Sequence, residues 1–351
     1  MKSYFRPEID AMEGYVPGEQ PKMANLVKLN TNENPFPPSP EVEKVLRCFD
    51  PERMRRYPDP RADVLREEVA RRNGVRKENV IVGNGSDDLL TMVFRAFTSP
   101  ELPMAMLYPS YSLYAELAAM QGSEVIRVPL TEKTFELPEN LLSIAEKANL
   151  LMITRPNAPT GNSFKFETVR EICQKFDGIV VIDEAYADFA PDNCMELAKT
   201  LPNVIVMRTF SKSYALAGLR LGYAVGSEIL IEGLMKLKDS YNVDMLSQEI
   251  AIAAYNDTQY FSQRVSEVKE MRSYLKKELE ALGFYCVDSC SNFIFAMPPD
   301  KDGERCFKLL REEAVIVRYF SADVTRQYVR ITIGNPAENA RLLEVLRGIY
   351  A

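Results

Sequence analysis

Histidine is absent from the 351 residues of this chain. Its absence excludes Ser-His-Asp and Cys-His catalysis, together with nearly every transition-metal site that uses imidazole ligands, so no metal centre is expected. Acid–base chemistry near neutral pH must therefore use a lysine, a tyrosine or a carboxylate whose pKa the protein has shifted. The six cysteines include no Cys-x-x-Cys pair, and we expect them to be the reduced thiols of a cytoplasmic protein.

Long apolar runs and the common nucleotide-binding motifs are also missing. No apolar run approaches the ~20 residues that span a bilayer, and no signal peptide is expected. The net charge of −7 argues against nucleic acid or an anionic membrane as the main partner. There is no Gly-x-Gly-x-x-Gly sequence and no Walker lysine, so the two common nucleotide sites are excluded.

What is present is an alternation of apolar, β-prone runs with helical patterns. We expect strands at 80–82, 104–108, 124–128, 150–154, 178–182 and 204–207, and helices at 62–73, 89–97 and 166–176. This alternation predicts the α/β class, with a mostly parallel sheet and helices on both of its faces.

The pattern changes after residue 245. We expect helices at 246–255, 259–282, 304–312 and 337–350, and strands at 292–296, 315–318 and 328–333. The predicted organisation is an N-terminal arm (1–30), a large domain (31–245) and a small α+β C-terminal domain (246–351). Arg318 and Arg330 lie on strands of the small domain. A strand arginine usually faces solvent, but two together suggest bidentate binding of an anionic group.

The most informative stretch is 203–226, where a buried strand is followed by Ser211, Lys212 and then Arg220. Ligands bind at strand ends in α/β sheets. A lysine there can form a Schiff base with an aldehyde, because desolvation and cationic neighbours favour its neutral form. Taken alone, a Ser-Lys pair is more often an ordinary surface loop, so its importance depends on the rest of the chain.

Three other strand ends carry polar or aromatic side chains. Two glycines precede Ser86 and Asp87 at a helix start, which either cradles a phosphate or simply caps the helix. Asp183 ends the most β-prone run, where a buried acid is either functional or part of a structural ion pair. Tyr111 follows another strand, and its ring either stacks on a flat heterocycle or packs in the core.

The order of these features resembles the fold-type I aminotransferases, and within them the histidinol-phosphate aminotransferases. The resemblance covers essentially the whole chain. Its marks are Asn32-Glu33-Asn34-Pro35, Tyr57-Pro58-Asp59, Gly83-Asn84-Gly85-Ser86-Asp87, Asp183-Glu184-Ala185-Tyr186, Arg208-Thr209-Phe210-Ser211-Lys212 through Ala217-Gly218-Leu219-Arg220, and Val329-Arg330-Ile331-Thr332. A Schiff-base lysine, an upstream acid, a phosphate cradle and a stacking aromatic together describe a pyridoxal phosphate site.

The resemblance implies a role for each matching residue. Lys212 would hold pyridoxal phosphate as a Schiff base and move a proton between substrate and cofactor. Asp183 would pair with the pyridine nitrogen and keep it protonated, so that the ring accepts electrons. Tyr186 would hydrogen-bond the phenolic oxygen of the ring, and Tyr111 would stack on the face of the ring.

The cofactor phosphate would be held by Ser86, Asp87, Ser211 and Arg220. In these aminotransferases, the residue that matches Tyr57 reaches the cofactor phosphate in the neighbouring subunit. The resemblance therefore implies a homodimer.

Substrate binding is implied for Arg330, together with Arg318 and Tyr15. Their anionic ligand would be the phosphate of histidinol phosphate in one half-reaction, and a carboxylate of glutamate or 2-oxoglutarate in the other, as in histidine biosynthesis. One position departs from the family pattern: Ala158 stands where an asparagine usually precedes Pro-Thr-Gly, and Asn157 lies one residue earlier. Adjacent side chains of an extended segment point opposite ways, so Asn157 replaces the missing amide only if the backbone is shifted.

Other functions remain open at this point. An aromatic amino acid transaminase or a decarboxylase of a phosphorylated amino acid would use the same lysine on the same scaffold. A regulatory domain that binds pyridoxal phosphate without catalysis is a third alternative, although the segment before residue 29 is too short for a DNA-binding domain. The last is an α/β protein without a cofactor.

Overall fold

The structure is a computed structural model that describes residues 3–12, 14 and 18–350. Its large sheet has, within these residues, seven strands in the order β2-β8-β7-β6-β5-β3-β4. They are β2 (Val80–Gly83), β3 (Met104–Tyr108), β4 (Val125–Pro129), β5 (Leu150–Thr154), β6 (Ile179–Asp183), β7 (Val204–Thr209) and β8 (Gly222–Gly226). Neighbours from β7 to β4 pair in parallel, whereas β8 is antiparallel to both β7 and β2.

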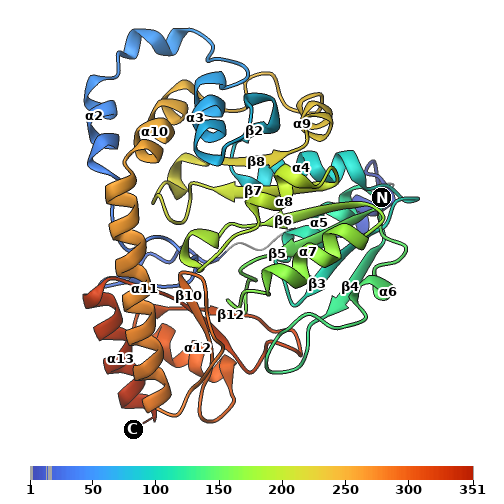
Figure 1. Cartoon of the computed structure of the whole chain (residues 1–351). Helices are drawn as coiled ribbons and strands as arrows, with labels where there is room; N and C mark the ends of the chain where they lie inside the picture. The colour runs from blue at the N-terminus through green and yellow to red at the C-terminus, as the bar shows by residue number, and fades with distance from the viewer. Residues whose placement is uncertain (1–2, 13, 15–17, 351) are drawn as a thin grey trace.

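Helices cover both faces of this sheet (Figure 1). One core contains residues of α3 (Asp63–Asn73), α7 (Phe166–Lys175), α8 (Met195–Thr200) and α10 (Met245–Asn256), and the other contains residues of α4 (Ser86–Phe97), α5 (Leu113–Met120) and α9 (Glu228–Met235). Because strand side chains alternate in direction, Val180 and Ile182 lie in the first core and Val181 lies in the second. Strands buried on both faces explain the continuous apolar runs of the sequence.

A smaller antiparallel sheet has the order β12-β13-β10-β9. Its strands are β9 (Tyr285–Cys286), β10 (Phe293–Met297), β12 (Arg318–Tyr319) and β13 (Val329–Thr332), and they share a core with α11 (Thr258–Ala281), α12 (Gly303–Glu312) and α13 (Pro336–Tyr350). This part occupies the lower left of Figure 1. A separate parallel pair joins β1 (Val27–Lys28) near the N-terminus to β11 (Val315–Ile316).

Shorter elements complete the fold. They are α1 (Pro7–Ala11), α2 (Pro40–Cys48), α6 (Leu141–Ile144) and the 3₁₀ turns η1 (Pro51–Arg55), η2 (Lys77–Asn79), η3 (Ala187–Phe189) and η4 (Ala217–Leu219). Among the described residues, no helix combines the length and the apolar character needed to cross a bilayer.

The structure confirms the predicted α/β class with its additional α+β part. It differs from the prediction at 315–318, which was expected to be one strand. β11 and β12 belong to different sheets, and Val317 between them is only 1% exposed, so the chain changes partner at a buried residue. The domain boundaries at 30 and 245 stay predictions.

Candidate active site

Lys212 lies just beyond the end of β7, in the turn that leads to β8. Its Nζ donates a hydrogen bond to the backbone carbonyl of Thr31 at 3.0 Å and lies 5.7 Å from the centre of the Tyr186 ring. Asn34 fixes the backbone of this turn, because its Nδ2 donates to the carbonyl of Lys212 at 2.9 Å. The amine therefore projects toward a segment that is about 180 residues away in sequence and toward the tyrosine that follows β6.

Asp183 is a buried carboxylate at the carboxyl end of β6. Its Oδ2 accepts a 2.6 Å hydrogen bond from the hydroxyl of Tyr114, and its Oδ1 accepts from the backbone N–H of Ala185 at 3.1 Å. Burial raises the pKa of Asp183, and these two hydrogen bonds oppose that rise. Burial also raises the pKa of the Tyr114 hydroxyl. The tyrosine thus stays protonated and acts as a donor to the acid.

Tyr186 follows Asp183 by three residues and lies between the two sheets. Its hydroxyl accepts a 2.9 Å hydrogen bond from Nδ2 of Asn32, and its ring packs edge-on against Phe293 of β10 with centroids 5.1 Å apart. The tyrosine is therefore held by residues from both ends of the chain.

A cradle forms where β2 and β8 meet the start of α4, whose first residue is Ser86. Gly85 has φ +83°, and a Cβ there would lie 2.7 Å from Nη2 of Arg220. A Cβ on Gly222 would lie 2.7 Å from the backbone nitrogen of Ser86. Only glycine permits this close approach. The result is a helix N-terminus with a guanidinium beside it, which is an anion-binding arrangement.

Arg220 connects the remaining members of this cradle. Its Nη2 bonds Oδ2 of Asp87 at 2.9 Å, and its Nη1 reaches Oγ of Ser211 at 3.5 Å. The Asp87 carboxylate also accepts from the hydroxyl of Tyr111 at 3.5 Å. The ring of Tyr111 meets the ring of Tyr114 edge-on at 5.5 Å, and this contact joins the cradle to the Asp183 site.

Asn157 is fully buried in the turn after β5. Its Nδ2 donates to the carbonyl of Pro109 at 3.0 Å and to Oγ1 of Thr160 at 2.8 Å, and its Oδ1 accepts from Ser110 at 3.1 Å. One N–H of the amide thus holds this turn together, and the other joins the turn to the segment that follows β3. Ala158 is buried in the core of the small sheet.

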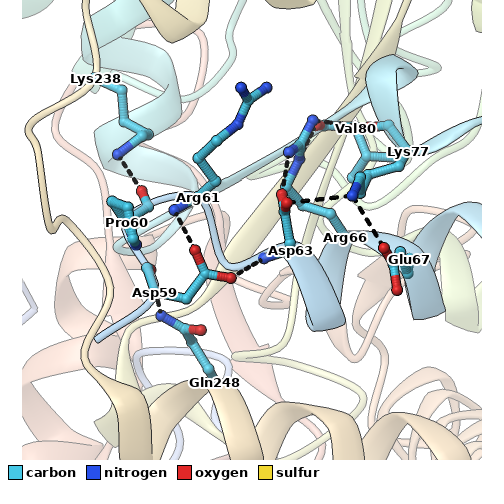
Figure 2. A network of polar contacts seen from close by, with 10 residues as sticks. All are labelled: Asp59, Pro60, Arg61, Asp63, Arg66, Glu67, Lys77, Val80, Lys238 and Gln248. Carbon is cyan, nitrogen blue, oxygen red and sulfur yellow. Dashed lines mark hydrogen bonds and ion pairs between the residues drawn. The ribbon is translucent and has the colours of Figure 1, made fainter.

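Tyr57 takes part in none of these contacts. Its ring is 79% exposed and stacks on Tyr241, with centroids 4.4 Å apart. Figure 2 shows how the backbone after it is fixed: the Asp59 carboxylate accepts from the backbone N–H groups of Arg61 and Asp63. Lys238 donates to the carbonyl of Pro60, and Gln248 donates to the carbonyl of Asp59. These hydrogen bonds hold the backbone beyond Tyr57, while the ring itself stays mostly exposed.

Arg318 and Arg330 are direct cross-strand partners on β12 and β13. Both guanidinium groups lie over the ring of Phe320, at 5.5 and 5.4 Å from its centre, and Nη2 of Arg330 donates to the carbonyl of Asn30 at 3.0 Å. Like charges placed opposite each other destabilise a sheet, so this pair suits a shared anionic ligand. Tyr15, the third residue predicted here, lies outside the described residues.

Sequence reasoning missed two contributors to this site. The segment 30–34 contacts Arg330, Lys212 and Tyr186, yet its Asn-Glu-Asn-Pro motif served only as a mark of resemblance. Tyr114 was not singled out either. It is the second residue of α5, whereas Tyr111 precedes that helix, so the spacing of the two tyrosines gave no helical-face signal.

The arrangement offers a lysine amine and a phenol in one group of contacts, and a buried acid and an anion cradle in a second group. The two groups are joined along the chain, by Ser211 next to Lys212 and by Asp183 three residues before Tyr186. The described residues contain no group of three or more cysteine or acidic side chains that could hold a metal ion. The donor set suits an aromatic aldehyde that carries a phosphate and a basic ring nitrogen.

Known proteins are similar to this chain in sequence and in fold. The family model of aminotransferases of class I and II matches residues 24–346. Histidinol-phosphate aminotransferase 1 of Nostoc sp. is 41% identical over 350 residues, which are 99% of each chain. Histidinol-phosphate aminotransferase of Syntrophotalea carbinolica is 42% identical over 350 residues, covering 98% of this chain and 99% of that protein.

Two solved structures have folds similar to this one. The crystal structure of histidinol-phosphate aminotransferase from Sinorhizobium meliloti in complex with pyridoxal-5'-phosphate has a TM-score of 0.90 and 25% identity, with 99% of each chain covered. L-threonine-O-3-phosphate decarboxylase from Porphyromonas gingivalis has a TM-score of 0.81 and 22% identity, covering 92% of this chain and 99% of that one. The second likeness concerns the fold alone.

Proposed function

The chain belongs to the class I and II aminotransferase family, and from this premise we propose that it is a histidinol-phosphate aminotransferase. It would exchange an amino group between histidinol phosphate and 2-oxoglutarate or glutamate, with pyridoxal phosphate as cofactor. The observation that carries the proposal is the segment 30–32, whose backbone carbonyls bind both Lys212 and Arg330. The reactive amine and one arginine of the proposed anion-binding pair thereby contact neighbouring residues of one short segment.

The described residues fit pyridoxal phosphate. When bound, this cofactor supplies an aldehyde that condenses with amines and a ring that accepts electrons from the substrate carbon. Lys212 Nζ is the amine that holds the cofactor and then moves a proton at the reacting carbon. Asp183, kept oriented by Tyr114, holds the proton of the ring nitrogen, and Tyr186 offers its hydroxyl to the phenolic oxygen of the ring.

The cradle would take the cofactor phosphate. Backbone N–H groups at the start of α4, the Ser86 and Ser211 hydroxyls and the Arg220 guanidinium are its donors. Asp87 is a carboxylate and has no proton to donate, so its side chain acts by orienting Arg220 and Tyr111.

Tyr111 would stack on the ring. Asn157 uses one N–H on Thr160 of its own turn and the other on the carbonyl of Pro109, just beyond β3. Ala158 offers no polar side chain, so Tyr186 becomes the principal partner of the ring oxygen.

Substrate anions would bind between Arg318 and Arg330, with Tyr15 as a further contact. A guanidinium fork accepts a phosphate and a carboxylate with the same bidentate geometry, which one site needs if it serves both half-reactions. We further propose a homodimer that acts in the cytoplasm. Its support is the exposed Tyr57, which would complete the phosphate site of the second subunit.

A coupled assay tests this function. The purified protein is given histidinol phosphate, phenylalanine or phosphothreonine, with 2-oxoglutarate as acceptor, and kcat/KM is measured for each donor. We expect the highest value with histidinol phosphate. A preference for phenylalanine would indicate an aromatic transaminase, and release of CO₂ from phosphothreonine would indicate a decarboxylase. Absence of turnover with all donors, despite cofactor binding, would indicate a regulatory protein.

A further inference from the structure

Three consecutive residues of segment 30–34 contact three different groups of the site. The carbonyl of Asn30 binds Arg330, the carbonyl of Thr31 binds Lys212, and the side chain of Asn32 binds Tyr186. The first two contacts use backbone atoms, which any residue could supply. The third depends on the asparagine side chain itself.

Asn32 is 1% exposed, and all of its polar groups are paired. Its backbone N–H donates to Oγ1 of Thr332 at 3.0 Å, and its carbonyl accepts from Nδ2 of Asn292 at 3.0 Å. Its φ of +57° is left-handed, a conformation that asparagine tolerates better than other residues with a side chain. The backbone at this point is therefore fixed by two residues of the small sheet.

The side-chain amide has a defined orientation. The hydroxyl of Thr332 donates to Oδ1 of Asn32 at 3.1 Å, which leaves Nδ2 facing Tyr186 at 2.9 Å. The hydroxyl of Tyr186 is then an acceptor in this contact. A tyrosine hydroxyl has one proton, and because Asn32 does not take it, Tyr186 can donate it to another acceptor.

Thr332 also relates this contact to substrate binding. Thr332 and Arg330 are two positions apart on β13, so their side chains lie on the same face of the sheet. Both bind segment 30–34, one at Asn32 and the other at Asn30. The strand that carries the proposed anion-binding arginine thus also orients the amide that controls Tyr186.

We propose that Asn32 is a positioning residue that directs the hydroxyl proton of Tyr186 into the site, toward the phenolic oxygen of pyridoxal phosphate. This inference rests on the proposed function, because it assigns Tyr186 to the cofactor ring. Asn32 itself does not touch the reacting atoms. Its effect is to make Tyr186 a donor rather than an acceptor at the cofactor.

Replacing Asn32 by aspartate separates this role from a purely structural one. In Asn32→Asp the size is kept and Thr332 still has an oxygen to donate to, but the donor facing Tyr186 becomes an acceptor. The carboxylate captures the proton of Tyr186, and the ring oxygen loses its hydrogen bond. A charge-assisted hydrogen bond corresponds to about one pKa unit or more.

The readout is the pH at which the visible absorbance of the cofactor-loaded protein changes. A ring oxygen without its donor holds the neighbouring imine proton more tightly, so Asn32→Asp should raise this pH by about one unit. In the Tyr186→Phe background the same substitution should have less than half of that effect. An equal rise in both backgrounds would show that the new charge acts directly and would overturn the proposal.

Thr332→Val provides a second variant that introduces no charge. Without the threonine hydroxyl the side-chain amide of Asn32 is free to flip, which exchanges Oδ1 and Nδ2. The pH of the absorbance transition should therefore rise by a smaller amount, about half a unit. Asn339→Asp is the matched control, since Asn339 is also buried but its side-chain amide hydrogen-bonds the backbone of Gly334, far from Tyr186 in the sequence and in a different set of contacts. It should lower the thermal unfolding midpoint and leave the transition pH unchanged.

Each outcome is informative. If Asn32→Asp does not fold, Thr332→Val carries the test, and an unshifted transition in that variant overturns the role of Asn32. If the wild-type protein develops no visible absorbance with pyridoxal phosphate, the proposed function fails. A normal wild-type spectrum with unshifted variants removes only the inference about Asn32.

Discussion

Replacing Tyr114 by phenylalanine should make Asp183 a weaker acid. The hydroxyl of Tyr114 supplies the 2.6 Å hydrogen bond to Oδ2 of this buried carboxylate, whereas the backbone N–H of Ala185 serves the other oxygen. Thr154 loses a partner as well, but it keeps its 3.0 Å contact with Ser110. The substitution therefore removes a donor from the acid and leaves no other side chain of this group unpaired.

The magnitude follows from the type of hydrogen bond. A hydrogen bond to a charged, buried group contributes about 1.5–3 kcal/mol, which corresponds to about one to two pKa units. Burial already raises the pKa of Asp183 above its value in the unfolded chain. Folding stability is then greatest when the acid is protonated in both states, and it falls as the pH rises through the pKa of the folded protein. In Tyr114→Phe this fall should extend to a pH that is higher by one to two units.

The assay is denaturant unfolding of the cofactor-free protein at a series of pH values. At pH values above both pKa values, Tyr114→Phe should lose about 1.5–3 kcal/mol more than it loses in acid. Tyr223→Phe is the control, because Tyr223 is buried in a different core. Its loss of unfolding free energy should be the same at every pH below the titration of the Tyr223 hydroxyl. Parallel curves of unfolding free energy against pH for wild type and Tyr114→Phe would refute the proposed link between the two residues.

Three further results are expected. Asp183→Asn should fold, but its activation free energy should rise by about several kcal/mol, because the neutral amide cannot hold a ring proton by charge. A near-normal kcat would show that this acid is structural. Arg330→Lys should lower kcat/KM for glutamate and for histidinol phosphate together. Arg318→Leu should lower kcat/KM for histidinol phosphate more than kcat/KM for glutamate. Equal losses for the two substrates in Arg318→Leu would contradict the assignment of Arg318 to the phosphate. Tyr57→Phe should weaken cofactor binding only if the protein is a dimer. If sedimentation shows a dimer and the cofactor dissociation constant is unchanged, this tyrosine is excluded from the partner's site.

The sequence was sufficient for much of the fold. The strands β3, β5, β6 and β7 were predictable because each is an apolar run buried on both faces of a parallel sheet. The direction of β8 was not predictable, since an apolar run reads the same in either direction. The break between β11 and β12 was missed for a similar reason: Val317 is as apolar as the residues of a continuous strand, and only the tertiary structure shows the change of sheet.

The candidate site was predictable where a residue follows a buried strand. Lys212 and Asp183 were singled out this way, although each alone has a structural explanation, and only their combination with the glycines before Ser86 and with Tyr111 indicated a cofactor site. Their roles stay predictions. Asn32 could not be assigned a role, since its partners Thr332 and Tyr186 are 300 and 154 residues away. Local pattern contains no information on contacts at that separation. Two of the contacts of Asn157 could likewise not be predicted, because Pro109 and Ser110 come from a different strand end.

Borohydride reduction of the cofactor-loaded protein, followed by peptide mapping, tests the central claim most directly. The amine of Lys212 is the group that the site presents beside Tyr186, so the stable pyridoxyl label should be found on Lys212. Lys212→Ala should lose the label and all turnover while it keeps some noncovalent binding through the phosphate cradle. A label on another lysine, such as Lys28, which contacts the side chain of Thr31, would contradict the account.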